Sequence, residues 1–122
     1  MTSHNQIIGK WGEKIAQAHL RANGYEILEI NHRTPFGELD IIAIEGDMLV
    51  FVEVKARTSN ILGNPEGSVT PKKQQHLVNS ALFYISELKE QYTDWRVDVV
   101  AITGKPNHGS PDIQVFPNAL HI

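Results

Sequence analysis

The sequence contains no cysteine among its 122 residues, which excludes disulfides, thiolate metal sites and thiol catalysis and fits a reducing compartment. No uninterrupted apolar run approaches the roughly 20 residues needed to cross a bilayer. The first six residues lack the basic start and the apolar stretch of a secretory signal. We therefore expect a cytoplasmic protein without a membrane partner.

Positive charge is scarce, since 11 Lys and Arg stand against 14 Asp and Glu, a formal net charge of −3. This balance argues against a protein that coats nucleic acid by charge alone. The six histidines form no HxH or HxxxH pair, so a zinc site is not expected. With 41% hydrophobic residues and no internal repeat or linker, residues 1–122 are expected to form a single domain.

Hydrophobic periodicity predicts two helices and five strands in the order αβββαββ. The helices are expected at 7–23 and 71–90, the strands at 25–31, 38–44, 48–57, 95–102 and 113–116, and a loop at 58–69. The third strand and its predecessor carry apolar residues on both faces, as strands in the centre of a covered sheet do. The sequence thus predicts an α/β fold, a mixed central sheet with a helix on each side.

A β-hairpin is predicted around Gly46-Asp47, which separates two apolar runs. Glycine in the first loop position is typical of a type II′ turn. A two-residue loop at this point pairs Glu45 with Met48 and fixes the register of both strands.

Following that register inward places Asp40 opposite Glu53 and Glu38 opposite Lys55. Residues directly opposite share a face, with Cβ atoms roughly 4.5–5.5 Å apart. A slip of one residue would move Asp40 to the other face. In the predicted register, two carboxylates and an ammonium group converge on one side of the sheet.

Asp40, Glu53 and the backbone carbonyl of Val54 are therefore candidate ligands for Mg²⁺ or Mn²⁺, because hard cations take oxygen ligands and need only one or two carboxylates. Lys55 could orient or deprotonate an attacking water, or neutralise charge in a phosphorane-like transition state. Metal-assisted hydrolysis of a phosphodiester requires this set of groups. A purely structural ion pair between Lys55 and either carboxylate remains the alternative.

Four basic residues are candidates for contacts with nucleic acid. Lys72 and Lys73 fall in the first turn of the predicted second helix, where the helix dipole disfavours cations. Phosphate binding would compensate for that position, although a solvated helix face explains it equally well. Arg33 and Arg57 could each contact a backbone phosphate, and Arg57 could equally clamp an acidic neighbour.

An aspartate followed thirteen residues later by Glu-Val-Lys resembles the signature of the PD-(D/E)XK nuclease superfamily, whose restriction-endonuclease-like core is αβββαβ. The chain is also similar to the bacterial YraN family, described as endonucleases related in fold to archaeal Holliday junction resolvases. That resemblance rests on GE at 12–13, NHR at 31–33, GELDIIA at 37–43, FVEVKAR at 51–57 and RVDVV at 96–100.

The resemblance implies that Asp40, Glu53 and Lys55 form the catalytic signature and that Glu13 is the acidic residue of the first helix. It also implies a DNA substrate, branched or otherwise structured, and a possible homodimer. Val97, where the family more often has Phe, should affect packing more than chemistry. Two functions remain open, a metal-dependent endonuclease and a non-catalytic nucleic-acid-binding or scaffold protein that retains the nuclease fold.

Overall fold

The structure, a computed structural model, describes residues 3–58, 70–89 and 94–120. Its elements are α1 (His4–Ala22), β1 (Glu26–Thr34), β2 (Gly37–Glu45), β3 (Met48–Arg57), α2 (Pro71–Ser86), β4 (Trp95–Thr103) and β5 (Asp112–Phe116). This order confirms the αβββαββ prediction. The second helix ends four residues before the predicted end, and the loop predicted at 58–69 lies outside the described residues except for its first residue.

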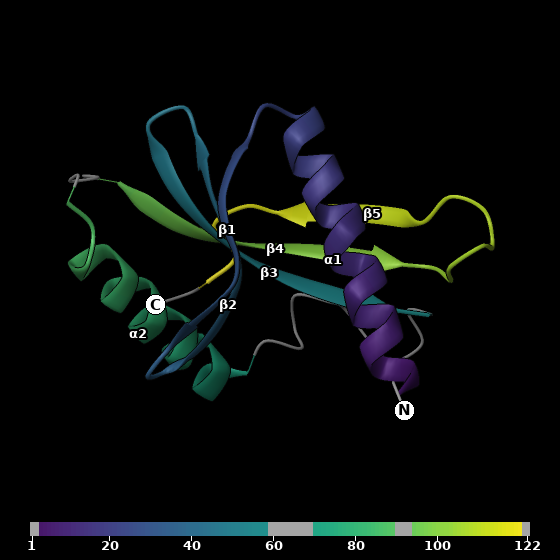
Figure 1. The fold of residues 1–122 in the computed structure, drawn as a ribbon, viewed down its shortest axis with the longest axis horizontal. Coiled ribbons are helices and arrows are strands. Elements are labelled where there is room, and N and C mark those ends of the chain that lie inside the picture. The colour runs from purple at the N-terminus through teal and green to yellow at the C-terminus, as the bar shows by residue number, and fades with distance from the viewer. Residues whose placement is uncertain (1–2, 59–69, 90–93, 121–122) are drawn as a thin grey trace.

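The five strands form one sheet in the order β1-β2-β3-β4-β5. β3 and β4 are parallel, and the other neighbours are antiparallel. A parallel pair needs a crossover connection, which here includes α2. The helices cover opposite faces of the sheet (Figure 1), so the predicted mixed sheet with a helix on each side is confirmed.

Two hydrophobic clusters hold the helices to the sheet, and β3 contributes to both. The cluster beneath α2 includes Leu39, Ile42, Leu49, Phe51, Leu77, Ala81 and Tyr84. The cluster beneath α1 includes Ala16, Leu20, Ile41, Ala43, Val50, Val52, Val100 and Ile102. Full burial of a large aliphatic or aromatic side chain stabilises a fold by roughly 1.5–3 kcal/mol. The two-sided burial of the central strands is as predicted.

Side-chain caps determine where both helices begin. The Ser3 hydroxyl accepts a hydrogen bond from the backbone of Gln6 at 3.2 Å, and the Gln6 side chain accepts one from the Ser3 backbone at 2.9 Å. This capping box starts α1 three residues before the predicted position. Thr70 caps α2 through the backbone N–H of Lys73 at 3.2 Å, with Pro71 in the first helical position, as the sequence predicted.

The first helix approaches the sheet closely at Gly12. Gly12 of α1 packs directly on Ala56 of β3, so that a Cβ added at Gly12 would overlap the Cβ of Ala56. This close contact fixes the position of the next residue, Glu13, over the sheet. Within the described ranges, neither helix has both the length and the apolar character needed to cross a membrane.

A buried ion pair ties β4 to the β2–β3 turn and to the C-terminal segment. Asp98 is fully buried and accepts hydrogen bonds from the guanidinium of Arg96 at 2.9 Å and from the backbone N–H of Asn118 at 2.9 Å. Arg96 also reaches Glu45 and the Tyr25 hydroxyl, each at 3.0 Å. The Asp98 carboxylate is thus fully satisfied, as a buried charge requires.

Candidate active site

The β2–β3 hairpin has the register that the sequence predicted. Glu45 pairs with Met48, and regular pairing continues as far as Ile41 and Val52. Gly46 has a φ of +60°, as the first position of a type II′ turn requires. The pairing ends one step before Asp40 and Glu53. Beyond this point, which we call the fork, β2 curves toward α2 while β3 continues beneath α1 (Figure 1).

Asp40 lies at the fork and bridges it with its side chain. Its Oδ2 atom accepts a hydrogen bond of 2.9 Å from the backbone N–H of Val54. A backbone donor at the end of a ladder needs a partner, and the carboxylate takes the place of a carbonyl of β2. Asp40 is also mostly buried, so the bond forms in a setting that disfavours an ionised carboxyl.

The two carboxylates that the sequence placed opposite each other do lie close enough to interact. Burial raises the pKa of Asp40 to about 7, the charge of Glu53 adds to this rise, and the Val54 hydrogen bond partly opposes it. Asp40 is therefore partly protonated near neutral pH in the metal-free protein. Because burial and the neighbouring carboxylate disfavour the charged form of Asp40, a cation bound beside the two carboxylates would be stabilising.

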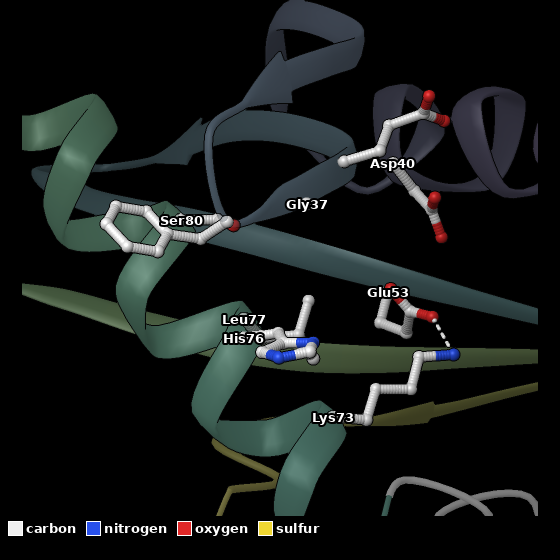
Figure 2. Close-up of a pocket in the computed structure, with 9 residues that line it drawn as sticks. Gly37, Asp40, Glu53, Lys73, His76, Leu77 and Ser80 are labelled. Carbon is white, nitrogen blue, oxygen red and sulfur yellow. Dashed lines mark ion pairs between the residues drawn. The ribbon is translucent and has the colours of Figure 1, made fainter.

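Glu53 is only 6% exposed and is flanked by two lysines. Its Oε1 atom lies 2.8 Å from the Nζ atom of Lys73 on α2 and 3.6 Å from that of Lys55. Figure 2 shows Lys73 reaching from α2 to Glu53, which lies between Lys73 and Asp40. Lys73 was predicted to contact nucleic acid, and no feature of the sequence indicated that it pairs with Glu53.

The two lysines differ in how firmly they hold their protons. Burial lowers the pKa of Lys55, and the neighbouring Lys73 lowers it further, against the opposing charge of Glu53. Burial also lowers the pKa of Lys73, but hydrogen bonding and attraction to Glu53 outweigh this effect, so the pKa of Lys73 is raised. Of the pair, Lys55 is therefore better suited to exchange a proton, and Lys73 to remain a cation.

Glu13 approaches the same cluster from α1. Burial raises the pKa of Glu13, and the charges of Glu38 and Glu53 act in the same direction, whereas a hydrogen bond with Asn31 lowers it. The first helix thus adds a third carboxylate to the electrostatic surroundings of Glu53, at the position that the family resemblance implied.

Asn31 belongs to the motif at 31–33 that supports the family resemblance, but it was not predicted to be a site residue. It has a φ of +52°, in the left-handed region that asparagine tolerates better than most residues. It lies opposite Asp40, between the pairs Ile30–Ile41 and His32–Leu39. The irregularity extends to β2, where Leu39 and Ile42 both face α2 while Ile41 faces α1. The strands are therefore distorted where Asp40 turns toward Val54.

A pocket of about 270 Å³ opens beside the carboxylates, between β2 and α2. Its lining is formed by Phe36, Gly37, Glu38, Asp40, Glu53, Lys73, His76, Leu77 and Ser80. Ser80 is buried and accepts a hydrogen bond from the Thr34 hydroxyl at 2.9 Å, which joins α2 to the β1–β2 turn. Of the helix residues in this lining, only Lys73 was predicted as a site residue, for nucleic-acid contact; His76, Leu77 and Ser80 were not, because the packing of α2 on the sheet brings them there.

Other predicted residues lie outside this cluster. The predicted register placed Glu38 opposite Lys55. In the structure Glu38 lines the pocket, and its carboxylate lies 3.7 Å from Arg33 of β1. The side chain of Arg33 is 89% exposed, and Lys72 is also exposed. Arg57 ends β3. These three basic residues remain predictions for nucleic-acid contacts, as does the Val54 carbonyl for metal binding.

The side chains at the fork suit a hard divalent cation. The described residues contain no group of three or more His, Cys, Asp or Glu side chains arranged around a common ion. Mg²⁺ needs fewer, because it keeps several waters and is commonly held by one or two carboxylates. Asp40 and Glu53 could supply these. Without a metal, their charges are offset by Lys73, by Lys55 and by partial protonation of Asp40.

The chain has clear relatives. The model of the Uncharacterised protein family UPF0102 matches residues 12–102. A UPF0102 protein of Thermodesulfovibrio yellowstonii is 54% identical over 98 residues, which cover 80% of this chain and 87% of the relative. UPF0102 proteins of Syntrophus aciditrophicus (46% identical, 85% and 82% covered) and Desulfitobacterium hafniense (39% identical, 93% and 95% covered) are also similar. These matches confirm the resemblance to the YraN family, and the chain belongs to the UPF0102 family.

Proposed function

We propose that this protein is a metal-dependent endonuclease that hydrolyses phosphodiester bonds of DNA in the cytoplasm, with branched or otherwise structured DNA as its substrate. The observation that carries the proposal is the meeting of Asp40 and Glu53 at the fork, beside a pocket and next to two lysines. Carboxylates forced together are costly unless a cation or a proton compensates them. A divalent metal would compensate the charges of both carboxylates and would also take part in catalysis.

Asp40 and Glu53 would hold Mg²⁺ or Mn²⁺, and Glu13 would add negative charge from α1. The bound cation would polarise the phosphate and lower the pKa of a water molecule. Lys55, with its lowered pKa, would orient that water and accept its proton. As the oxygen of the water bonds to phosphorus, the bond from phosphorus to the leaving oxygen breaks, and that oxygen takes up a proton.

The test is cleavage of junction, flap and linear DNA with Mg²⁺ or Mn²⁺. The double variant Asp40→Asn/Glu53→Gln should lose activity and metal binding, since both substitutions preserve shape while removing charge. Asp47→Asn, in the exposed hairpin turn, is a control that removes one carboxylate away from the site. Cleavage that persists in the double variant would refute the assignment. DNA binding without any metal binding would instead favour a non-catalytic scaffold.

A homodimer is part of the proposal, because a two-fold symmetric junction presents two equivalent strands to a symmetric pair of subunits. Light scattering of the protein with and without junction DNA would measure the stoichiometry. A single protomer on the junction under conditions that support cleavage would contradict this part.

A further inference from the structure

One oxygen of Glu53 is shared by two ammonium groups, and they hold it unequally. The Nζ atom of Lys73 lies 2.8 Å from Oε1, a full charge-assisted hydrogen bond, whereas that of Lys55 lies 3.6 Å away. Glu53 itself is nearly inaccessible to solvent. The principal compensating charge of this carboxylate therefore comes from α2, not from its own strand.

A divalent ion bound by Glu53 would need the space and the charge compensation that Lys73 now provides. Carboxylate oxygens bind Mg²⁺ at about 2.0–2.1 Å, and a second cation on the same oxygen would face strong repulsion at such short range. Both cations would also interact with Asp40, whose charge acts on Lys73. The two cations are thus alternatives at the Oε1 atom of Glu53.

Lys73 can leave this position more readily than Lys55. Its side chain is 39% exposed and that of Lys55 is 21% exposed, so the Lys73 ammonium group can reach water by a change of rotamer. Its backbone is held separately by the Thr70 cap, and α2 need not move when the side chain does. A solvated lysine avoids the cost of a buried, unpaired charge.

We propose that Lys73 is a resident counter-ion of Glu53 that a divalent metal displaces when it binds. The proposal rests on the function proposed above and adds a mechanism to it. In the metal-free protein Lys73 offsets the buried carboxylates, and on metal binding it moves away from Glu53 at the margin of the pocket. Lys73 is then a positioning residue whose presence weakens metal binding, unlike a ligand, whose presence strengthens it.

The test compares Mn²⁺ affinity, measured by calorimetry, in the wild type, Lys73→Met and Lys72→Met. Removing the competing charge should tighten Mn²⁺ binding about tenfold in Lys73→Met, which corresponds to roughly 1.4 kcal/mol. Lys72→Met removes the same charge from the same helical turn, but at an exposed position, and should change the affinity by less than about twofold.

Two further measurements separate competition from other effects. Lys73→Arg keeps the charge and should bind Mn²⁺ no more tightly than the wild type. Without metal, Lys73→Met should unfold at a lower temperature than the wild type, because Glu53 loses its nearest cation. Saturating Mn²⁺ should then raise the melting temperature of Lys73→Met more than that of the wild type.

The outcomes distinguish this proposal from the function on which it rests. Equal or weaker Mn²⁺ binding by Lys73→Met would overturn the displacement mechanism and leave a metal-dependent nuclease intact. Tightening by Lys72→Met to the same extent would also overturn it, since general charge would then be the cause. Absence of Mn²⁺ binding in every variant would refute the metal-dependent function itself, and displacement with it.

Discussion

The Asp40 carboxylate accepts a hydrogen bond from the backbone N–H of Val54, across the point where β2 and β3 stop pairing. A side chain thus continues the contact between two strands for one further step. The same carboxylate faces Glu53, and its position at the end of the ladder explains both its burial and its raised pKa.

Asp40 should make the stability of the metal-free protein depend on pH. The unfolded chain loses this proton near the ordinary value of 3.8, whereas the folded protein keeps it to about 7. The folded state then binds more protons in this interval, so the free energy of unfolding contributed by Asp40 falls as pH rises from 3.8 to about 7. Asp40→Asn, which keeps a hydrogen-bond acceptor, should remove this decrease.

Urea denaturation at several pH values in this interval, with chelator present, measures the effect. Asp47→Asn in the exposed turn should retain the pH dependence of the wild type. Parallel curves for the wild type and Asp40→Asn would show that the Asp40 carboxyl does not hold its proton in the folded protein.

Metal binding should expel the proton from Asp40. Below the raised pKa of about 7, an incoming cation must replace this proton, so Mn²⁺ affinity should increase as pH approaches 7 and level off above it. Calorimetry in two buffers of different ionisation enthalpy gives the number of protons released. That number should decline as the pH is raised through 7, and a constant value would be inconsistent with protonation of Asp40.

The contact between Gly12 and Ala56 should be intolerant of one added methyl group. Gly12→Ala should lower the free energy of unfolding by about 1–3 kcal/mol through overpacking, although alanine is the better helix former. Gly9→Ala, with no atom within 4 Å of the added Cβ, should instead stabilise the protein by up to about 1 kcal/mol. The double variant Gly12→Ala/Ala56→Gly removes the overlap and should recover stability. Failure of this rescue would point to a different cause.

Substitution of Asp98 should lower the free energy of unfolding without changing Mn²⁺ binding at the fork. Asp98→Ala leaves Arg96 largely buried without its main partner and should cost about 3–5 kcal/mol in the free energy of unfolding. Glu45→Gln, at a side chain that is 43% exposed, should cost less than about 1 kcal/mol. Mn²⁺ affinity at low temperature, where the Asp98 variant remains folded, should match the wild type. A selective loss of Mn²⁺ binding would link this network to the site.

Arg33 should contribute to DNA binding without contributing to stability. Its side chain is 89% exposed, so Arg33→Ala should leave the melting temperature nearly unchanged. If Arg33 contacts a phosphate, the slope of log affinity against log salt should fall by about one. Arg21→Ala on α1, also exposed, makes the same change of net charge. Equal losses of DNA affinity in both variants would exclude a specific contact at Arg33.

The hairpin was predictable because local chemistry determines it. Gly46 favours a two-residue turn, the turn fixes the register, and the alternation of residues along β3 then assigns Glu53 to the face that α2 covers. The early start of α1 could also have been recognised, since Ser3 and Gln6 are spaced as a capping box.

The Lys73–Glu53 ion pair could not be predicted in the same way. It depends on how α2 packs after a crossover, and no local spacing in the sequence encodes that placement. The sequence marked Lys73 as an unfavourable charge in the first turn of a helix and as a candidate phosphate contact, not as a partner of Glu53. The distortion at Asn31 and the end of the β2–β3 ladder likewise arise from tertiary packing, which bends strands whose local sequences look regular.

The hydrogen bond from Val54 gives Asp40 a structural role that is independent of the proposed hydrolysis. Losing the acceptor would leave a backbone donor unsatisfied, at a cost of about 1–3 kcal/mol. A relative without the proposed activity would therefore still be under selection to retain Asp or Asn here, merely to fold. Glu53 contacts chiefly cationic side chains, so it could be lost together with them, and position 53 is the more informative place to look for retention of the proposed activity.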